Sequence, residues 1–456
     1  MLPVCAIFDI GKTNKKCFLF DNNFQIVYEQ QIQFDEIYDD DGFHAEDLDK
    51  LSNWIKETFE QLLNDERFEI KALNFSAYGA SLVHLDFLGK TIAPLYNYLK
   101  PYPETLLAQF YKQHGNPKDL TLQTASPNLG MLNAGLQLYW LKHSKPAIYN
   151  KIEHSLHLPQ YCSFLFTQKP VSEITSLGCH TFLWDFRQEK YHQWIAKEQI
   201  HSLGQMLMPS FVSFKIPNMQ SLSQIQVGVG MHDSSAALVP YLMAFTEPFL
   251  LISTGTWSIS MNPFSTDAIT ASDLRKDCLN YLTFRGNIVK ASRLFSGNQH
   301  DRQTKHLAEY FGKEPSFYKM IPYLPSMIDK IRGKFDQTLP NETNLSILED
   351  STFSDRNLNE FGSYEEAYHQ LMLDLMARQV AAIQLVMGKT PIKQIFVDGG
   401  FSKNELFMNL LAEAFPKKQI FASEISQATA LGAALVVGQH WTSQTFGIEH
   451  FKLKKY

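Results

Sequence analysis

Two short turns centred on glycine, each set between apolar runs of β type, limit most strongly what this chain can fold into. The first, Asp9-Ile-Gly-Lys-Thr13, follows the run at 4–8 and precedes another strand-like run. The second, Ser253-Thr-Gly-Thr-Trp257, lies in the other half of the chain between two similar runs. Each set continues through a further turn into more strand-like sequence. The recurrence predicts a long-period duplication of a strand–turn–strand unit.

The two turns have the chemistry of a phosphate-binding loop. A glycine lets the backbone approach a phosphate closely, exposed N–H groups of a turn form an anion-binding concavity, and threonine hydroxyls add donors. A single turn of this kind is most often an ordinary tight turn, but its repetition in both halves favours nucleotide binding. Neither turn is a Walker loop, because Gly11-Lys-Thr13 lacks the earlier glycine and a strand follows it.

With 456 residues the chain is too long for one ordinary core, so we expect two domains, at 1–243 and 244–456. Hydrophobic residues make up 45% and charged residues 19%, which is typical of a folded globular protein. The net charge of −6 gives no electrostatic reason to expect nucleic acid or a membrane surface as partner. We therefore expect a small-molecule partner, and a monomer or homodimer.

The start of the sequence does not have the pattern of an export signal. The N-terminus enters a strand at once, and no run approaches about 18 uninterrupted apolar residues. These features predict a cytoplasmic protein. The 5 cysteines are widely spread, without a Cys-x-x-Cys pair, which argues against a disulfide framework or a zinc site.

Hydrophobic periodicity predicts the main elements. The middle of the chain, about 100 to 225, is rich in aromatic residues and resembles insertions on a scaffold, where substrate contacts often lie. The acidic turn at 35–42 is expected to face solvent. Helices are predicted at 45–63, 104–114, 134–143, 234–241, 364–387, 404–414 and 428–438, and strands at 71–85, 394–397 and 419–422.

Four segments follow one another in a recognisable order: Asp9-Ile-Gly-Lys-Thr-Asn14, Gly230-Met-His-Asp-Ser234, Ser253-Thr-Gly-Thr-Trp257, and Asp398-Gly-Gly-Phe-Ser-Lys-Asn404 followed by Ala428-Thr-Ala-Leu-Gly-Ala433. Together they resemble the FGGY carbohydrate kinases, from residue 4 to about 440. The resemblance implies an α/β fold with two ribonuclease H-like domains of the actin, hexokinase and Hsp70 type, a cleft between them that closes on ligands, and ATP and Mg²⁺ as cofactors.

The resemblance also implies roles for individual residues. Asp233 is the expected catalytic base, because a sugar hydroxyl is a poor nucleophile until a carboxylate accepts its proton. The expected sugar contacts are His232, Asp233 and Gly79, and the expected magnesium residues are Asp9 and Asp233. The expected ATP residues are Gly11, Lys12, Thr13 and Asn14 in the first turn, Thr254, Gly255 and Thr256 in the second, and Gly399, Gly400, Asn404, Ala428 and Gly432 around the adenosine.

Each of these residue types also has a purely structural interpretation. Asp233 is equally suited to cap the helix that follows it, and a lone histidine such as His232 is usually structural. Asp9 and the Asp398-Gly-Gly400 segment have the form of ordinary turns at strand ends. Lys12 is as well suited to solvent as to phosphate. The order of the four segments favours the functional interpretations of Asp233, Asp9 and the Asp398–Gly400 turn, and leaves His232 and Lys12 open.

The motifs also indicate a substrate. His232-Asp233 and Ser253-Thr-Gly-Thr-Trp-Ser258 are closest to the rhamnulokinase and fuculokinase branch, which implies L-rhamnulose or L-fuculose phosphorylated at the C1 hydroxyl. The chain departs from the family in two places. It has Tyr96-Asn-Tyr-Leu-Lys100 where many members have Trp/Tyr-x-Asp-x-Arg, and Lys12 where a small or hydroxyl residue is common. Xylulose, ribulose or glycerol, or a catalytically silent sugar sensor, are the alternatives.

Other users of the same fold fit the sequence less well. An Hsp70 chaperone needs a substrate-binding domain after the nucleotide domains, and a repressor of the ROK class needs a DNA-binding segment before them. An actin-like filament protein would not need Asp233 in its Gly-x-His-Asp setting. A sugar kinase is therefore the function that the sequence favours.

Overall fold

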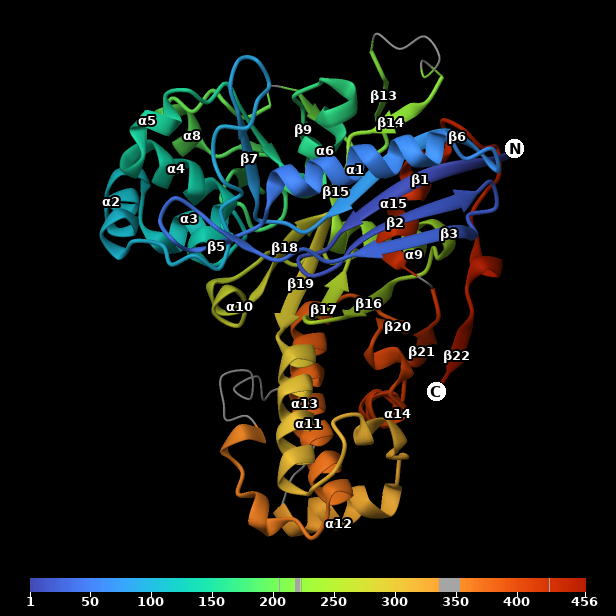
Figure 1. Cartoon of the computed structure of the whole chain (residues 1–456). Helices are drawn as coiled ribbons and strands as arrows, with labels where there is room; N and C mark the ends of the chain where they lie inside the picture. Colours follow the sequence, from blue (N-terminus) through green and yellow to red (C-terminus); the bar gives the residue numbers. More distant parts are fainter. Residues whose placement is uncertain (205, 218–221, 223, 336–352, 426) are drawn as a thin grey trace. The chain divides into compact units, whose positions relative to one another are not determined.

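The computed structural model describes residues 1–204, 206–217, 222, 224–335, 353–425 and 427–456. They group into two compact units, shown as part of the whole chain in Figure 1. Unit 1 comprises Met1–Ala244, Asn280–Ile288 and Ser426–Gly447, and unit 2 comprises Phe245–Leu279, Val289–Ile425 and Ile448–Tyr456. The units are thus not continuous in sequence, whereas the predicted domains 1–243 and 244–456 are.

The first sheet contains the first glycine turn. Strands β1 and β2, and β2 and β3, are antiparallel, whereas β6 is parallel to β1, and β14 is parallel to β6. The short β15 (Met231–His232) also pairs with β6. The spatial order is β13 (Ser213–Lys215), β14 (Gln226–Gly228), β6 (Phe68–Ala77), β1 (Leu2–Ile10), β2 (Lys15–Asp21) and β3 (Ile26–Ile32).

The second sheet repeats this plan. Its order is β18 (Cys278–Leu282), β19 (Ile288–Leu294), β17 (Ser258–Asn262), β16 (Phe249–Thr254), β20 (Gln394–Gly399), β21 (Gln419–Ser423) and β22 (Leu453–Lys455). From β19 to β22 the relative strand directions match those from β3 to β13. Six strands of the same order and direction therefore occur twice, which confirms the predicted duplication.

Helices cover the sheets, and shorter strand pairs lie outside them. The helices of unit 1 are α1 (Leu48–Leu63), α2 (Glu104–His114), α3 (Pro117–Gln123), α4 (Ala134–Ser144), α5 (Pro146–Tyr149), α6 (Leu158–Thr167), α7 (Ile174–Leu177), α8 (Gln193–Lys197), α9 (Asp233–Ala244) and α15 (Ala428–Gly438). Those of unit 2 are α10 (Ala271–Arg275), α11 (Ser296–Tyr310), α12 (Pro325–Phe335), α13 (Tyr364–Met387) and α14 (Glu405–Ala414). The strand pairs are β4 (Ile37–Tyr38) with β5 (His44–Ala45), β7 (Leu82–Leu85) with β8 (His154–His157), β9 (Ser172–Glu173) with β12 (Leu207–Met208), and β10 (Trp184–Asp185) with β11 (Lys190–Tyr191).

Local sequence explains where the helices begin and end. Asp47 caps α1 by accepting a hydrogen bond from the Lys50 N–H, and Ser363 caps α13 in the same way through Glu366. At the other end of α13, Gly388 adopts a φ of 50°, a left-handed conformation that favours glycine. The predicted helices at 364–387 and 428–438 are confirmed at both ends, and those at 104–114 and 134–143 to within a residue.

In unit 1, α15 and α9 pack closely against each other. A Cβ on Gly432 of α15 would lie 1.9 Å from the backbone oxygen of Ala236 in α9, so no larger residue fits without moving a helix. The buried Asn74 of β6 joins this pair to the sheet: its amide donates to the Ala433 carbonyl at 2.8 Å, and its oxygen accepts from the Gly230 N–H at 3.1 Å. These contacts fix the position of the segment that leads into α9.

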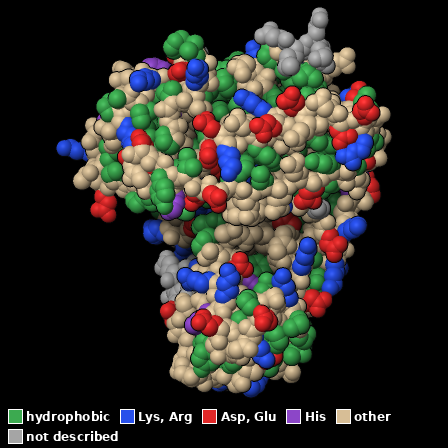
Figure 2. All heavy atoms as spheres, viewed as in Figure 1, with side chains coloured by type: hydrophobic (Ala, Val, Ile, Leu, Met, Phe, Trp, Pro, Cys, Tyr) green, Lys and Arg blue, Asp and Glu red, His purple; other side chains and the backbone are tan. Residues whose placement is uncertain are grey.

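Among the described residues, no helix is both long and apolar enough to cross a membrane. On the face shown in Figure 2, basic and acidic side chains are interspersed.

Candidate active site

The first glycine turn lies between β1 and β2 and is tightly closed. The Gly11 N–H donates to the Asn14 carbonyl at 2.9 Å, and a Cβ on residue 11 would lie 2.9 Å from that oxygen, so glycine is required. Thr13 is exposed at the tip. The Asn14 side-chain oxygen accepts hydrogen bonds from Gln31 at 3.1 Å and Gln33 at 2.7 Å. The turn is therefore held from β3 while its tip remains open to a ligand.

Asp9 lies just before this turn in an environment that destabilises its charge. Burial raises its pKa to about 6, a hydrogen bond from the Thr429 hydroxyl at 2.8 Å lowers it, and the charge of Asp233 raises it further. Lys16 is the direct partner of Asp9 across the β1–β2 pair, and its ammonium donates to Gln427 at 3.1 Å. Sequence reasoning missed Lys16 and Thr429, although the register of a tight hairpin would have placed Lys16 opposite Asp9.

Asp233 is the first residue of α9, directly after β15. Its Oδ1 accepts a hydrogen bond from the Ser234 N–H at 2.6 Å and lies 3.1 Å from the Nε2 atom of His232. Burial raises its pKa to about 6, with the bonds from Ser234 acting in the opposite direction. A carboxylate with a pKa near 6 is mostly ionised at neutral pH and is a better proton acceptor than an ordinary aspartate.

His232 is 3% exposed and packed on several sides by unit 1. Its Nε2 lies 3.1 Å from the Cys179 sulfur, its backbone N–H donates to the Thr175 hydroxyl at 3.0 Å, and its ring is 5.5 Å from that of Tyr281. A Cβ on Gly79 would lie 3.0 Å from the ring. The structure thus brings His232, Gly79 and Asp233 together, and the contacts of His232 are those of a residue that positions Asp233.

The Lys12 side chain is not simply exposed to solvent but lies among other side chains. Its ammonium lies 3.1 Å from the Glu36 carboxylate, and 5.9 Å and 6.0 Å from the ring centres of Tyr78 and Tyr98. Burial and then the charge of Asp233 raise the pKa of Tyr98. Lys12 therefore belongs to a cluster of side chains that extends toward Asp233.

The second glycine turn lies between β16 and β17. The Thr254 hydroxyl is buried: it donates to the Asp398 carbonyl and accepts from the Phe401 N–H at 3.0 Å. A Cβ on Gly399 would lie 1.8 Å from the Thr254 carbonyl oxygen. Thr254 and Gly399 thus join the ends of β16 and β20, while Gly255 and Thr256 form the exposed part of the turn.

A cavity of about 820 Å³ in unit 2 opens beside this turn. That volume is in the range of nucleotide and drug-sized ligand sites. Four residues predicted from the sequence line it: Gly255, Thr256, Gly400 and Asn404. Residues that sequence reasoning missed complete the wall: His300, Asp301, Tyr318, Lys319, Met320, Ile321, Pro322, Phe401, Lys403 and Glu405, with Gly297 under the turn.

Asn404 is held at the cavity by both ends of its carboxamide. Its oxygen caps α14 by accepting from the Phe407 N–H at 3.0 Å, and its amide donates to the Tyr368 hydroxyl at 2.8 Å. That hydroxyl lies 3.2 Å from the Nε2 atom of His300. Burial lowers the pKa of His300, which favours its neutral ring. The bond to Tyr368 uses one of the two N–H donors of the Asn404 amide.

Ala428 and Gly432, predicted at the adenosine, belong to unit 1. Ala428 begins α15, beside the Gln427 and Thr429 side chains that contact Lys16 and Asp9. Gly432 is buried against α9.

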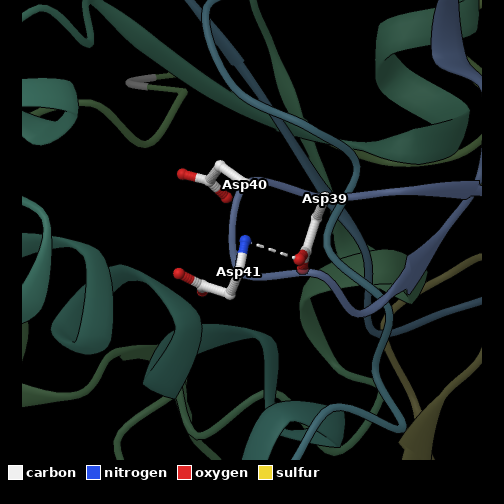
Figure 3. A group of neighbouring side chains, drawn as sticks. All are labelled: Asp39, Asp40 and Asp41. Carbon is white, nitrogen blue, oxygen red and sulfur yellow. Dashed lines mark hydrogen bonds between the residues drawn. The ribbon is translucent and has the colours of Figure 1, made fainter.

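The sequence predicts that the acidic turn at 35–42 faces solvent, but in the structure its aspartates form ion pairs with lysines. Figure 3 shows its three consecutive aspartates, with the Asp41 N–H donating to the Asp39 carboxylate. The Lys100 ammonium lies 2.5 Å from carboxylate oxygens of Asp39 and of Asp41, and that of Lys145 lies 2.6 Å from Asp40 and 2.7 Å from Asp41. Two lysines distant in sequence thus offset part of the negative charge of the turn, in which Asp39 is buried. Since ammonium groups already occupy these carboxylates, the cluster does not suit a metal ion.

Asp9 and Asp233 are better suited to magnesium. The charge of Asp233 contributes to the raised pKa of Asp9, so the negative charges of the two carboxylates repel each other. Mg²⁺ in kinases is usually held by one or two carboxylates, waters and the substrate phosphates. A divalent cation would remove this repulsion, so the residues present fit the ion.

A sheet of this topology that occurs twice in one chain, each copy with a glycine turn after its first long strand, is the architecture of the ribonuclease H-like kinases. Comparison with known proteins identifies the family. The N-terminal domain of the FGGY family of carbohydrate kinases matches residues 4–233, and its C-terminal domain matches residues 368–440. The chain belongs to this family, and it is a carbohydrate kinase.

Similar proteins agree with this assignment. Rhamnulokinase of Halalkalibacterium halodurans is 24% identical over 93% of this chain and 91% of its own length. Rhamnulokinase of Oceanobacillus iheyensis is 24% identical over 94% and 91%. The crystal structure of a carbohydrate kinase from Novosphingobium aromaticivorans superposes with a TM-score of 0.80 at 21% identity, covering 100% of this chain and 94% of that one.

These findings confirm the predicted fold class, an α/β chain with two ribonuclease H-like domains, and the predicted resemblance to rhamnulokinases. They also confirm the predicted enzyme class. Members of the family use ATP and typically a divalent metal ion.

Proposed function

We propose that the chain transfers a phosphoryl group from ATP to the C1 hydroxyl of a 6-deoxyketohexose, L-rhamnulose or L-fuculose. The similarity to two curated rhamnulokinases over most of the chain supports this class of acceptor. The observation on which the proposal chiefly rests is the setting of Asp233, a carboxylate of raised pKa at the start of α9, close enough to Asp9 for their charges to interact.

In the proposed reaction, Asp233 accepts the proton of the sugar hydroxyl as that oxygen attacks the γ-phosphorus. His232 and the Ser234 N–H hold the carboxylate in place through contacts of 3.1 Å and 2.6 Å. Such a base contributes about 10² to 10⁴ in rate. Asp9 and Asp233 would hold Mg²⁺, which neutralises charge on the phosphate oxygens when bound.

Unit 2 supplies the nucleotide site in this proposal. Asn404 and Gly400 line the cavity and face the adenosine, and the backbone N–H and hydroxyl of the exposed Thr256, next to Gly255, bind phosphate. In unit 1, the backbone N–H groups of Lys12 and Thr13, at the tip of the first turn, bind phosphate next to Asp9. Thr254 and Gly432, whose atoms are committed to packing, support these sites from within.

The first experiment is a coupled assay of ADP release with ketopentoses, ketohexoses, 6-deoxyketohexoses, glycerol and aldonates. We expect the highest kcat/KM for a 6-deoxyketohexose. A clear preference for xylulose, ribulose or glycerol would reassign the acceptor. No release with any acceptor, while ATP still binds, would indicate a sugar sensor and overturn the proposal.

The second experiment replaces the base. Asp233→Asn keeps the shape and the acceptor for the Ser234 N–H but cannot take a proton, so we expect kcat to fall about 10² to 10⁴-fold. The Kd of ATP, measured by calorimetry without magnesium, should change less than about twofold. A turnover number near that of the wild type would exclude Asp233 as the base.

A further inference from the structure

We propose that Lys12, although it lies in the first glycine turn, recognises the acceptor sugar: its ammonium forms one wall of the sugar site and donates hydrogen bonds to oxygens of a neutral ketose. This inference rests on the proposed function. It assigns the Lys12 side chain to recognition of the sugar, whereas the backbone of the same turn binds phosphate.

The first support is the direction of the Lys12 side chain. Glu36 holds the ammonium at 3.1 Å, and the rings of Tyr78 and Tyr98 lie about equally far from it, at 5.9 Å and 6.0 Å. Attraction between a cation and two aromatic faces stabilises this placement. The side chain remains 24% exposed, and an ammonium has three N–H donors, so donors remain after the bond to Glu36.

Buried polar contacts hold the backbone of Lys12 in place. Lys15, three residues on, forms a buried ion pair with Glu46 and donates to the Lys12 carbonyl at 3.0 Å. The Tyr78 hydroxyl donates to the other oxygen of Glu46 at 2.7 Å. A charged pair with additional hydrogen bonds is costly to disrupt once buried. The backbone of Lys12 and the Tyr78 ring are therefore fixed relative to each other.

The same cluster reaches the base. The Tyr98 ring lies 6.1 Å from that of Tyr78, and the charge of Asp233 contributes to the raised pKa of Tyr98. Gly79, which follows Tyr78, packs against His232, the neighbour of Asp233. A hydroxyl that donates its proton to Asp233 therefore belongs to a molecule within the surroundings of Tyr98 and Lys12.

A different lysine stands on the phosphate side of the turn. Lys16 pairs with Asp9 across β1 and β2, and its positive charge lowers the pKa of that carboxyl. Its ammonium donates to Gln427 at 3.1 Å, next to the Thr429 that bonds Asp9. Since Lys16 supplies positive charge beside Asp9, Lys12 is not needed there.

The charges around Lys12 indicate the class of acceptor. Its ion pair with Glu36 cancels the positive charge, so the site offers donors without a net attraction for anions. Tyr98 adds an aromatic face that suits the C–H groups and the methyl carbon of a deoxy sugar. Lys100, which lies two residues after Tyr98, forms ion pairs with Asp39 and Asp41 and is not available to a substrate in the same way. These features favour a neutral deoxyketose over an aldonate.

The test compares Lys12→Met, which keeps the length of the stem and removes the donors, with Lys50→Met as a control. Lys50 is an exposed lysine of α1 whose ammonium also lies over an aromatic ring, that of Phe34 at 5.1 Å. We expect Lys12→Met to raise the KM of the sugar about tenfold or more, with the KM of ATP within about twofold. Lys50→Met should change neither value.

An unchanged sugar KM in a correctly folded Lys12→Met protein would overturn the role, and a rise in the ATP KM alone would assign Lys12 to phosphate instead. If that variant does not fold, Glu36→Gln gives an independent result. By leaving the Lys12 charge unneutralised, it should raise kcat/KM for gluconate relative to the deoxyketose, and an unchanged ratio would overturn the proposal. A wild-type enzyme inactive on every sugar would instead overturn the proposed function itself.

Discussion

At the residue scale, unit 1 contains two carboxylates, those of Asp9 and Asp233, whose ionisation is unfavourable in the folded protein. Burial raises the pKa values of Asp9 and Asp233 to about 6, and each lies in a folded environment that favours its protonated form. Evolution of a binding site often places such groups where they destabilise the fold but serve the reaction. In the proposed reaction, their negative charge is needed only when a cation or a proton-donating hydroxyl is present.

This conflict predicts a pH-dependent gain in stability for Asp233→Asn in the metal-free protein. The folded pKa is raised from 3.8 to about 6, so the stabilisation by the protonated form is complete below about pH 4 and is lost as the pH rises through 6. The neutral amide avoids this loss. We expect a gain of about 1–2 kcal/mol at pH 8 and almost none at pH 4, since a side chain 31% exposed keeps part of its hydration.

Thermal unfolding in EDTA at several pH values measures this effect. Asp329→Asn, on the exposed side of α12, serves as the control and should leave the midpoint unchanged throughout. A gain for Asp233→Asn that is equal at pH 4 and pH 8 would show that ionisation is not its cause.

The sequence alone predicted which residues belong to the candidate site better than it predicted where their side chains point. The order of motifs located Asp233, Gly400 and Asn404, and the structure places the last two on one cavity. It left Lys12 between phosphate and solvent, because its partner Glu36 lies beyond two strands and a turn. The contribution of Lys16 follows from the register of the tight β1–β2 hairpin, which a comparison of motifs alone does not use.

At the scale of elements, the contact between α9 and α15 positions Asp233, the proposed base. Gly432→Ala would insert a Cβ 1.9 Å from the Ala236 oxygen, so the two helices must separate. We expect a loss of about 1–3 kcal/mol in unfolding free energy and a lower kcat, because α9 begins at Asp233. Chemical denaturation and the coupled assay measure the two effects.

A matched control is the same substitution in α12. A Cβ on Gly333 meets no atom within 4 Å, and alanine is the better helix former, so Gly333→Ala should be neutral or stabilising by up to about 1 kcal/mol. If Gly432→Ala behaved like Gly333→Ala, the close helix contact would not be what fixes α9.

Elements with strong periodicity were predictable, and polar ones were not. Apolar residues recur through 364–387 and 428–438, and both helices form with the predicted bounds. Helix α11, which carries His300, escaped sequence reasoning because most of its residues are polar and its buried side includes Gln303 and Thr304. Its helical form depends on packing against partners remote in sequence.

At the scale of the whole molecule, the proposed function assigns different tasks to the two copies of one sheet plan. Unit 2 provides a cavity lined entirely by its own residues, and unit 1 contains Asp9, Asp233 and Lys12. Changes around this cavity should therefore weaken the binding of ATP and leave the KM of the sugar unchanged. This division is testable with a residue of unit 2 that does not line the cavity.

Tyr368→Phe removes the hydroxyl that accepts from Asn404 and contacts His300. Losing one hydrogen bond to a positioning group costs about 1 kcal/mol, so we expect the Kd of ATP to rise about fivefold to tenfold, with the sugar KM unchanged. Tyr310→Phe, which removes an exposed hydroxyl bonded to Asn359, is the control. A Tyr368→Phe protein in which the sugar KM rose as much as the Kd of ATP would contradict the division.

The discontinuity of unit 1 has a consequence for how the protein is made. Helix α15, which packs on α9 and bonds to Asp9 through Thr429, is synthesised after nearly all of unit 2. Domains usually fold as they leave the ribosome, from the N-terminus onward. The early strands of unit 1 lack this packing partner until α15 has been synthesised. A nascent chain stalled before residue 428 would therefore leave the α15-facing surface of α9 and the surroundings of Asp9 exposed. Chaperone demand is therefore expected to peak late in translation.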